Sequence, residues 1–136
     1  MSGLKKVNAG KVMTGGCLCG GVRYRLSGEL RGVINCFCGQ CRKTSGHHVA
    51  ATRVSLTDFE LIDDSTLHWY DSSQEARRGF CRKCGGNLFW QNHSRDTISI
   101  MAGTLDAPTG LATIDNIYTD DASDYQIIPE LDAGCP

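Results

Sequence analysis

The chain has 136 residues, of which 40% are hydrophobic and 21% are charged, and its formal net charge is −1. These values are typical of one soluble globular domain, so we expect a single domain over residues 1–136, with a core at about 12–118 and peripheral ends. They exclude a strongly basic nucleic-acid-binding surface, and no apolar run approaches the ~18 residues of a membrane span.

The first residues, MSGLKKVNAGKVM (1–13), contain lysines but lack the apolar stretch of a secretory signal peptide. We therefore expect a cytoplasmic protein whose thiols stay reduced. Eight cysteines in a reducing compartment indicate metal binding rather than disulfides. They fall into two pairs, one triple and one isolated residue: Cys17 and Cys19, Cys81 and Cys84, Cys36, Cys38 and Cys41, and Cys135.

Period-2 alternation of apolar and polar residues recurs along the chain and predicts short antiparallel strands. In GVRYRLSG (21–28), Val22, Tyr24 and Leu26 alternate with polar residues, as expected for a half-buried strand. Clusters of Gly, Asn, Asp and Ser separate such segments. Further strands are predicted within 47–56, 59–63, 66–72, 75–81, 87–92 and 96–105. The chain is therefore predicted to be all-β.

Short helices are predicted at only two places. One is GQCRKTSG (39–46), where Gly46 suits a helix end, and the other is SLTDFEL (55–61), where Ser55 or Thr57 could cap a single turn. The segment from residue 118 onward is acidic and weakly patterned. It is expected to pack Tyr125, Ile127 and Ile128 onto the sheet and then to fray.

The outer cysteine pairs share a pattern, because Cys19 and Cys84 are each followed by two glycines and then by a predicted strand. Glycine after the second ligand permits a positive φ, which lets backbone N–H groups turn toward the sulfurs of a zinc knuckle. Cys17, Cys19, Cys81 and Cys84 are therefore predicted to hold one structural zinc in a closed tetrahedral site. The alternatives are free thiols or two disulfides, of which the Cys-x-Cys bridge would close a strained small ring.

Cys36, Cys38 and Cys41 lack a fourth cysteine in a matching knuckle, and three protein ligands with an open position are typical of catalytic zinc. Three thiolates favour soft-ligand chemistry, such as holding a substrate thiol, over activation of water. Several alternatives stay open. The triple could belong to an iron–sulfur cluster or consist of buried apolar thiols. A residue of the same chain could also complete the site, and the candidates are Cys135, His47, His48, His68 and His93.

Four segments are similar to signature blocks of the glutathione-dependent formaldehyde-activating enzyme family, which also includes centromere protein V-like domains. They are GGCLCGGVRY (15–24), CFCGQCRKTSG (36–46), FCRKCGGNL (80–88) and GTLD (103–106). The resemblance implies antiparallel sheets pinned by zinc, sometimes called a β-tent, and two zinc ions per chain. It implies a structural zinc at Cys17, Cys19, Cys81 and Cys84 and a catalytic zinc at Cys36, Cys38 and Cys41.

The activity that the resemblance implies is the reversible joining of formaldehyde and glutathione to S-hydroxymethylglutathione, formally a carbon–sulfur lyase reaction. One residue departs from the family pattern, because Phe37 stands where the usual middle block has histidine. An imidazole beside an open zinc can move a proton or orient a ligand, and a phenyl ring can do neither. We expect phenylalanine at this position to leave metal binding intact and to affect the proton-transfer steps of the reaction.

A thiol substrate such as glutathione needs cationic partners for its carboxylates, and Arg42 and Lys43 directly follow Cys41, with Arg53 further along. Alternatively, these are solvated surface charges. Trp90 and Phe89 should lie on opposite faces of one strand, so that one belongs to the core and Trp90 is a candidate wall of the pocket.

Other polar residues are interpreted as structural. Asp106 is expected to cap the GTLD turn, with a catalytic role as the alternative, and His68 is expected to be exposed. Cys135 is interpreted as a free terminal thiol. The competing function is a non-catalytic, zinc-stabilised protein-binding module. A nucleic-acid zinc ribbon is disfavoured by the acidic balance, and the oligomeric state is left open.

Overall fold

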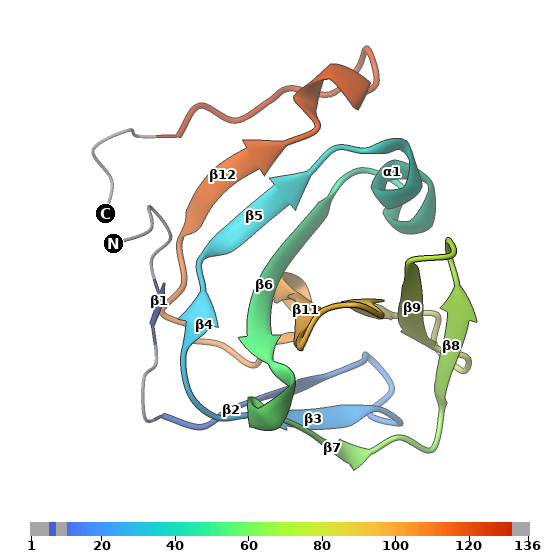
Figure 1. The fold of residues 1–136 in the computed structure, drawn as a ribbon, viewed down its shortest axis with the longest axis vertical. Helices are drawn as coiled ribbons and strands as arrows, with labels where there is room; N and C mark the ends of the chain where they lie inside the picture. Colours follow the sequence, from blue (N-terminus) through green and yellow to red (C-terminus); the bar gives the residue numbers. More distant parts are fainter. Residues whose placement is uncertain (1–5, 8–10, 132–136) are drawn as a thin grey trace.

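The computed structural model describes residues 6–7 and 11–131, and it confirms the predicted all-β fold with short helical turns (Figure 1). The largest sheet has seven strands, and most neighbouring pairs are antiparallel. In order across this sheet, its strands are β12 (Thr113–Ile117), β5 (Val33–Cys36), β6 (Val49–Ser55), β11 (Thr97–Met101), β10 (Asn87–Asn92), β9 (Ala76–Cys81) and β8 (Leu67–Asp71).

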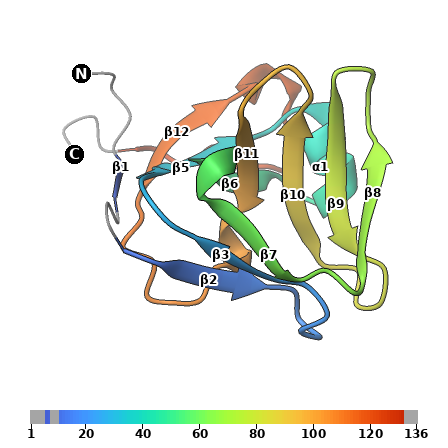
Figure 2. The same ribbon diagram turned by 60° about the horizontal axis from the view of Figure 1, so that its bottom comes forward.

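A second sheet of three strands crosses beneath one end of the first (Figure 2). Its strands, in order, are β2 (Met13–Gly16), β3 (Arg23–Leu26) and β7 (Phe59–Asp63). A short ladder joins β1 (Lys6–Val7) to β4 (Leu30–Arg31). The chain thus forms two sheet layers that can enclose a core between them.

The core lies between the seven-stranded and the three-stranded sheet. Tyr24 and Leu26 on β3 face inward with the period of two that the sequence predicts, and Arg25 between them is exposed. The rings of Tyr24, Phe59 and Phe89 meet edge to face or tilted, with centroids 5.2–6.3 Å apart. Aromatic pairs in these arrangements add stabilisation beyond the apolar area that they bury.

Truncation of Phe89 is expected to be severely destabilising, because its side chain is fully buried and contacts Tyr24, Phe59 and Trp69. Phe89→Ala should lower the free energy of unfolding by about 3–5 kcal/mol, measured by urea denaturation of the metal-loaded protein. The control is Ile127→Ala, since Ile127 is 86% exposed and its truncation should change stability by less than about 0.5 kcal/mol.

The opposite face of the seven-stranded sheet is not covered by the second sheet. The residues on this face alternate with core residues, so that Ala51 and Arg53 on β6 flank the inward-facing Thr52. Direct register places Arg78 opposite Trp90, Trp90 opposite Ser99, and Ser99 opposite Arg53. These four side chains therefore form one row across β9, β10, β11 and β6.

One α-helix, α1 (Gly39–Ser45), follows β5 and confirms the helix predicted at 39–46. Cys38 caps its N-terminus, and Gly46 ends it with a φ of 84°, a conformation that favours glycine. The single turn predicted within 55–61 is also confirmed, as the 3₁₀ turn η1 (Leu56–Asp58), which has Ser55 at its N-cap position and ends where β7 begins at Phe59. Two more 3₁₀ turns occur, η2 (Ala102–Thr104) and η3 (Thr119–Asp121). No helix among the described residues has the length and apolar character needed to cross a membrane.

Several strands were not predicted from the alternation pattern, namely β1, β2, β4, β5 and β12. β2 contains two glycines, which have low strand propensity, and β12 pairs with β5 in parallel rather than antiparallel. The expected packing of the tail onto the sheet is wrong for two of its three residues. Tyr125 and Ile127 are exposed, and only Ile128 is half-buried.

Candidate metal centres

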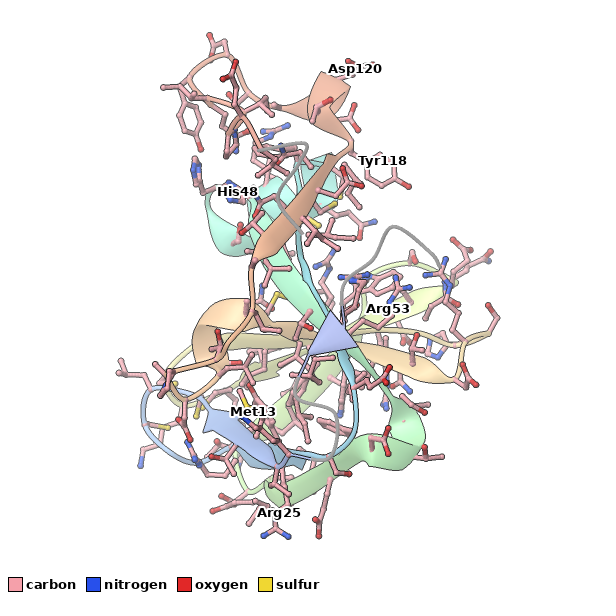
Figure 3. All side chains as sticks on the ribbon, turned by 90° about the vertical axis from the view of Figure 1, so that its left-hand side faces the viewer. Met13, Arg25, His48, Arg53, Tyr118 and Asp120 are labelled. Atoms are coloured by element: carbon pink, nitrogen blue, oxygen red, sulfur yellow. The ribbon has the colours of Figure 1, made fainter. Side chains whose placement is uncertain are left out.

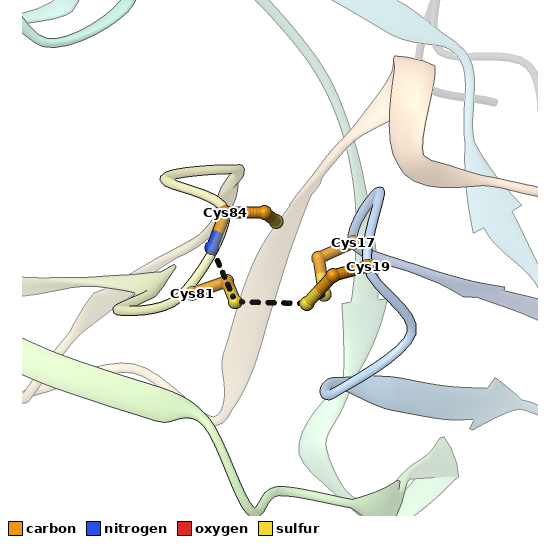
Figure 4. Close-up of side chains that lie close together, drawn as sticks. All are labelled: Cys17, Cys19, Cys81 and Cys84. Carbon is orange, nitrogen blue, oxygen red and sulfur yellow. Dashed lines mark hydrogen bonds between the residues drawn. The ribbon is translucent and has the colours of Figure 1, made fainter.

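The first cysteine cluster joins the two sheets. Cys17 and Cys19 lie in the loop between β2 and β3, whereas Cys81 ends β9 and Cys84 lies in the turn before β10 (Figure 4). Their four Sγ atoms lie within 4.8 Å of one another, although the two pairs are more than 60 residues apart in sequence. The Sγ atoms of Cys17 and Cys19 are 3.7 Å apart, and those of Cys19 and Cys81 are 3.6 Å apart.

These distances fit a tetrahedral metal ion and not disulfides. Zinc–sulfur bonds of ~2.3 Å give tetrahedral edges of ~3.8 Å, close to the observed separations. A disulfide requires ~2.05 Å between sulfurs, and the seven cysteines among the described residues are all free thiols. Cys17, Cys19, Cys81 and Cys84 therefore fit a closed four-thiolate site, as the sequence predicts.

The surroundings of Cys81 favour its thiolate. The N–H groups of Lys83 and Cys84 each donate to its Sγ atom at 3.3 Å, and the Thr66 hydroxyl lies 3.1 Å away. Burial acts to raise the pKa of Cys81, but these hydrogen bonds outweigh it and lower the pKa to about 5. A group that is already ionised near neutral pH is ready to bind a metal ion.

The glycines of the two knuckles have the conformation that the sequence suggests. Gly20 and Gly85, which directly follow Cys19 and Cys84, have φ values of 83° and 78°. Their N–H groups donate to the carbonyl oxygens of Cys17 and Cys81, at 3.2 and 2.8 Å. Each knuckle is thus a tight turn that a residue with a Cβ atom would strain.

The second cluster contains Cys36 at the end of β5, Cys38 at the N-cap of α1 and Cys41 in its first turn. Their Sγ atoms also lie within 4.8 Å of one another. The Cys41 N–H donates to the Cys38 Sγ atom at 3.3 Å, so the helix N-terminus holds the sulfurs together. All three cysteines line a cleft of about 740 Å³ over the uncovered face of the seven-stranded sheet.

No fourth ligand joins this triple within the part of the chain that the structure describes. The His47 Nδ1 atom is 3.0 Å from the Tyr125 hydroxyl, and the His48 ring packs on Phe37. His68 contacts Phe80 and His93 lies 3.8 Å from Asp71, both away from the triple. Cys135 lies outside the described residues. The donor set of three soft thiolates thus fits a metal ion that retains an open position.

Phe37 does not face the cleft. Its side chain is fully buried, its ring centroid is 4.7 Å from that of His48, and it is not among the cleft residues, whereas its neighbours Cys36 and Cys38 are. Figure 3 shows His48 on the opposite side of the ribbon from Arg53 and Tyr118, which both line the cleft. A side chain at position 37 therefore cannot reach a ligand in the cleft in this arrangement.

The two aromatic residues of β10 face opposite ways. Phe89 lies in the core, and Trp90 lies on the cleft floor, where it packs against the second cysteine cluster. Arg42 and Lys43 do not line the cleft, although both lie on α1, and Lys43 is exposed. Asp106 does not line the cleft either. Its carboxylate pairs with Arg23 at 2.7 Å and accepts a hydrogen bond from Thr14.

The basic residues of the cleft come from other elements: Arg31, Arg53, Arg78 and Arg95. Of these, the sequence suggested Arg53 alone. Arg78 is the closest to the second cluster, with its Nη2 atom 3.8 Å from the Cys41 Sγ atom and 3.5 Å from the Gln40 Oε1 atom. Strand alternation through ARRGFC (76–81) is the signal that could have identified it, since Arg78 shares a face with Ala76, opposite to Arg77.

Comparison with known proteins gives two findings. The family model described as glutathione-dependent formaldehyde-activating enzyme matches residues 12–121. A crystal structure of a Rhodobacter sphaeroides protein superposes with a TM-score of 0.62 and 26% sequence identity, covering 76% of this chain and 99% of that one. The family match includes both cysteine clusters and all the residues that line the cleft.

Proposed function

We propose that this chain, which belongs to the glutathione-dependent formaldehyde-activating enzyme family, binds a small thiol in its cleft and joins it reversibly to an aldehyde. The observation that supports this proposal is the cluster of Cys36, Cys38 and Cys41, which opens on the cleft and has no fourth ligand among the described residues. The reaction would be of the carbon–sulfur lyase type, with glutathione and formaldehyde as the reference substrates.

Two zinc ions are the cofactors proposed for this chain. Cys17, Cys19, Cys81 and Cys84 would hold a structural ion, and Cys36, Cys38 and Cys41 would hold a second one. When bound to the triple, zinc supplies a Lewis acid that favours the thiolate form of a substrate thiol. The remaining requirements are met by the chain itself, which must orient the thiol and limit its contact with water.

The cleft provides an apolar floor beside the triple. Val49 and Met101 form one hydrophobic cluster with Cys41, and Trp90, Cys36 and Cys38 pack against this cluster. A small thiol would therefore lie on apolar side chains with its sulfur toward the triple. In the forward reaction a carbon–sulfur bond forms between the thiol sulfur and the aldehyde carbon. The carbonyl π electrons move to the oxygen, which takes up the proton that the thiol gives up, and the reverse reaction returns both.

The proposal is tested by nuclear magnetic resonance with zinc-loaded protein, glutathione and ¹³C-formaldehyde. We expect the exchange between free formaldehyde and the S-hydroxymethyl adduct to accelerate in proportion to protein concentration, and a chelator to abolish the acceleration. X-ray absorption at the zinc edge should also show one more sulfur atom bound to zinc when glutathione is added. If neither effect occurs, the function is instead that of a non-catalytic, zinc-stabilised protein-binding module.

A further inference from the structure

The end of the cleft that is remote from the cysteines is strongly basic. Arg31, Arg53 and Arg95 line it, and the cleft as a whole has four arginines but a single acidic residue, Glu75. Arg31 is buried, Arg53 is half-buried, and Arg95 extends from the turn between β10 and β11 with its guanidinium 5.9 Å from the centre of the Trp90 ring. The three side chains come from different elements and converge on one end of the cleft.

The arginines of this end form no salt bridge with the described part of the chain. Its salt bridges join other residues, and none involves an arginine of the cleft. Glu29 and Asp58 border the smaller neighbouring pocket with Arg31 and Arg53, and Asp58 forms no ion pair with either arginine. The Arg31 guanidinium instead donates to two backbone carbonyl oxygens, those of Gly32 and Ala51.

Repulsion among the arginines is evident in their pKa values. Burial, followed by the charge of Arg53, lowers the pKa of Arg31 to about 10, and burial followed by the charge of Arg95 lowers that of Arg53. The guanidinium groups of Arg31 and Arg53 nevertheless remain charged near neutral pH. Like charges held together in a partly buried cleft favour the binding of an anion that relieves the repulsion.

Arg78 lies at the other end of the cleft, beside the cysteine triple. Its side chain is only 3% exposed, and its Nε and Nη1 atoms have no hydrogen-bond partner among the described residues. A buried charge with unpaired donors is costly, by several kcal/mol, unless another group compensates it. Arg78 thus leaves two free donors at the sulfur end of the cleft, beside the cysteine triple.

The strand register separates the two ends of the cleft. On β6, Val49 lies opposite Cys36, and Arg53 lies four residues further along the same strand. At ~3.3 Å per residue, their Cα atoms are about 13 Å apart. Between them the floor offers Ala51 and, opposite it, Met101, which suit an extended ligand whose middle is uncharged.

We propose that the substrate thiol carries a dianionic group, a phosphate or a pair of carboxylates, at its end remote from the sulfur, and that Arg31, Arg53 and Arg95 bind this group. This inference rests on the proposed function. The planar forks of arginine match phosphate and carboxylate oxygens in pairs, and three such forks are matched better by a dianion than by a single carboxylate. Glutathione offers a weaker match, because its two carboxylates lie at opposite ends and one stands beside an ammonium group.

Binding to zinc-loaded protein, measured by isothermal titration calorimetry, tests the inference with two matched pairs of thiols. Phosphopantetheine and pantetheine differ only in the remote phosphate, and N-acetyl-Cys-Gly-Glu and N-acetyl-Cys-Gly-Gln differ only in the added carboxylate. At least one dianionic member should bind about tenfold or more tightly than its partner that lacks the added charge, and the pair that shows the larger ratio identifies the dianion. The preference should weaken as the salt concentration rises.

Variants of the arginines distinguish a specific anion-binding subsite from nonspecific electrostatic attraction. Arg53→Gln and Arg95→Gln should each reduce the preference for the dianion over its matched partner by roughly tenfold. Because Arg95 is exposed, we expect Arg95→Gln to fold like the unmodified protein. The control is Arg25→Gln, which removes the same charge from the exposed side of β3 and should have no effect.

Failure of the inference can be told apart from failure of the proposed function. If the two members of each matched pair bind equally well, the dianion subsite is overturned while thiol binding is supported. If no thiol binds but inorganic pyrophosphate does, and Arg53→Gln abolishes that binding, the arginine subsite is supported and the thiol chemistry is overturned.

Discussion

Cys81→Ser is expected to leave the protein unfolded at 25 °C. Structural zinc contributes about 10–16 kcal/mol in small zinc domains, which equals or exceeds the whole stability of a typical domain, about 5–15 kcal/mol. Here the four-cysteine cluster joins loops of the two sheets that enclose the core, so loss of one ligand should separate both layers. Circular dichroism should show loss of the sheet signal, and a chelator should produce the same change in the unmodified protein.

The matched control lies two residues away in the same turn. Lys83 is exposed between Cys81 and Cys84, so Lys83→Ser should retain the fold, the zinc content and the melting temperature within a few degrees. A Cys81→Ser protein that melts within a few degrees of the unmodified one would show that this cluster is not what joins the two sheets.

Cys38→Ser is expected to give a folded protein that has lost its adduct-forming activity by at least about a hundredfold. The substitution removes a soft metal ligand but keeps a good N-cap, because a serine Oγ atom can accept the Cys41 N–H as the Cys38 Sγ atom does. The second cluster lies on the cleft side of the large sheet, outside the main core. The expected result is one zinc ion lost per chain, measured by metal analysis, with the melting temperature nearly unchanged.

Lys43→Ser is the control for this experiment, since Lys43 lies on the same helix but outside the cleft and should keep full activity. Two results would contradict the prediction for Cys38→Ser. If the variant loses as much stability as Cys81→Ser, the second site is structural and the open-site interpretation is wrong. If it stays folded and retains the activity, the triple does not take part in the reaction.

Local patterns determined the strands that alternate clearly and the two groups of cysteines. The alternation of Val22, Tyr24 and Leu26 predicted the inward face of β3, because side chains on a strand point to opposite faces in turn. The Cys-Gly-Gly repeats predicted tight knuckles, because only a residue without a Cβ atom adopts a positive φ without strain. Grouping the cysteines as two pairs and one triple also predicted which sulfurs would meet.

Other features depend on pairings between distant segments, which no local pattern contains. The parallel pairing of β12 with β5 brings together residues about 80 positions apart, and the short β2 and β5 lack a clear alternation. The tail contacts His47 through Tyr125 instead of covering the sheet. Such contacts are decided by which faces remain unburied once the two sheets have packed.

The sequence by itself thus determined which cysteines gather in the two candidate metal centres, because residue type and spacing are local properties of the chain. Only the tertiary structure decided what surrounds the second centre. It turned Phe37 into the interior, left Arg42 and Lys43 outside the cleft, and aligned Arg78, Trp90, Ser99 and Arg53 in one row across four strands. The physical reason is that cross-strand register, which sets these neighbours, is fixed by burial of the opposite face of the sheet.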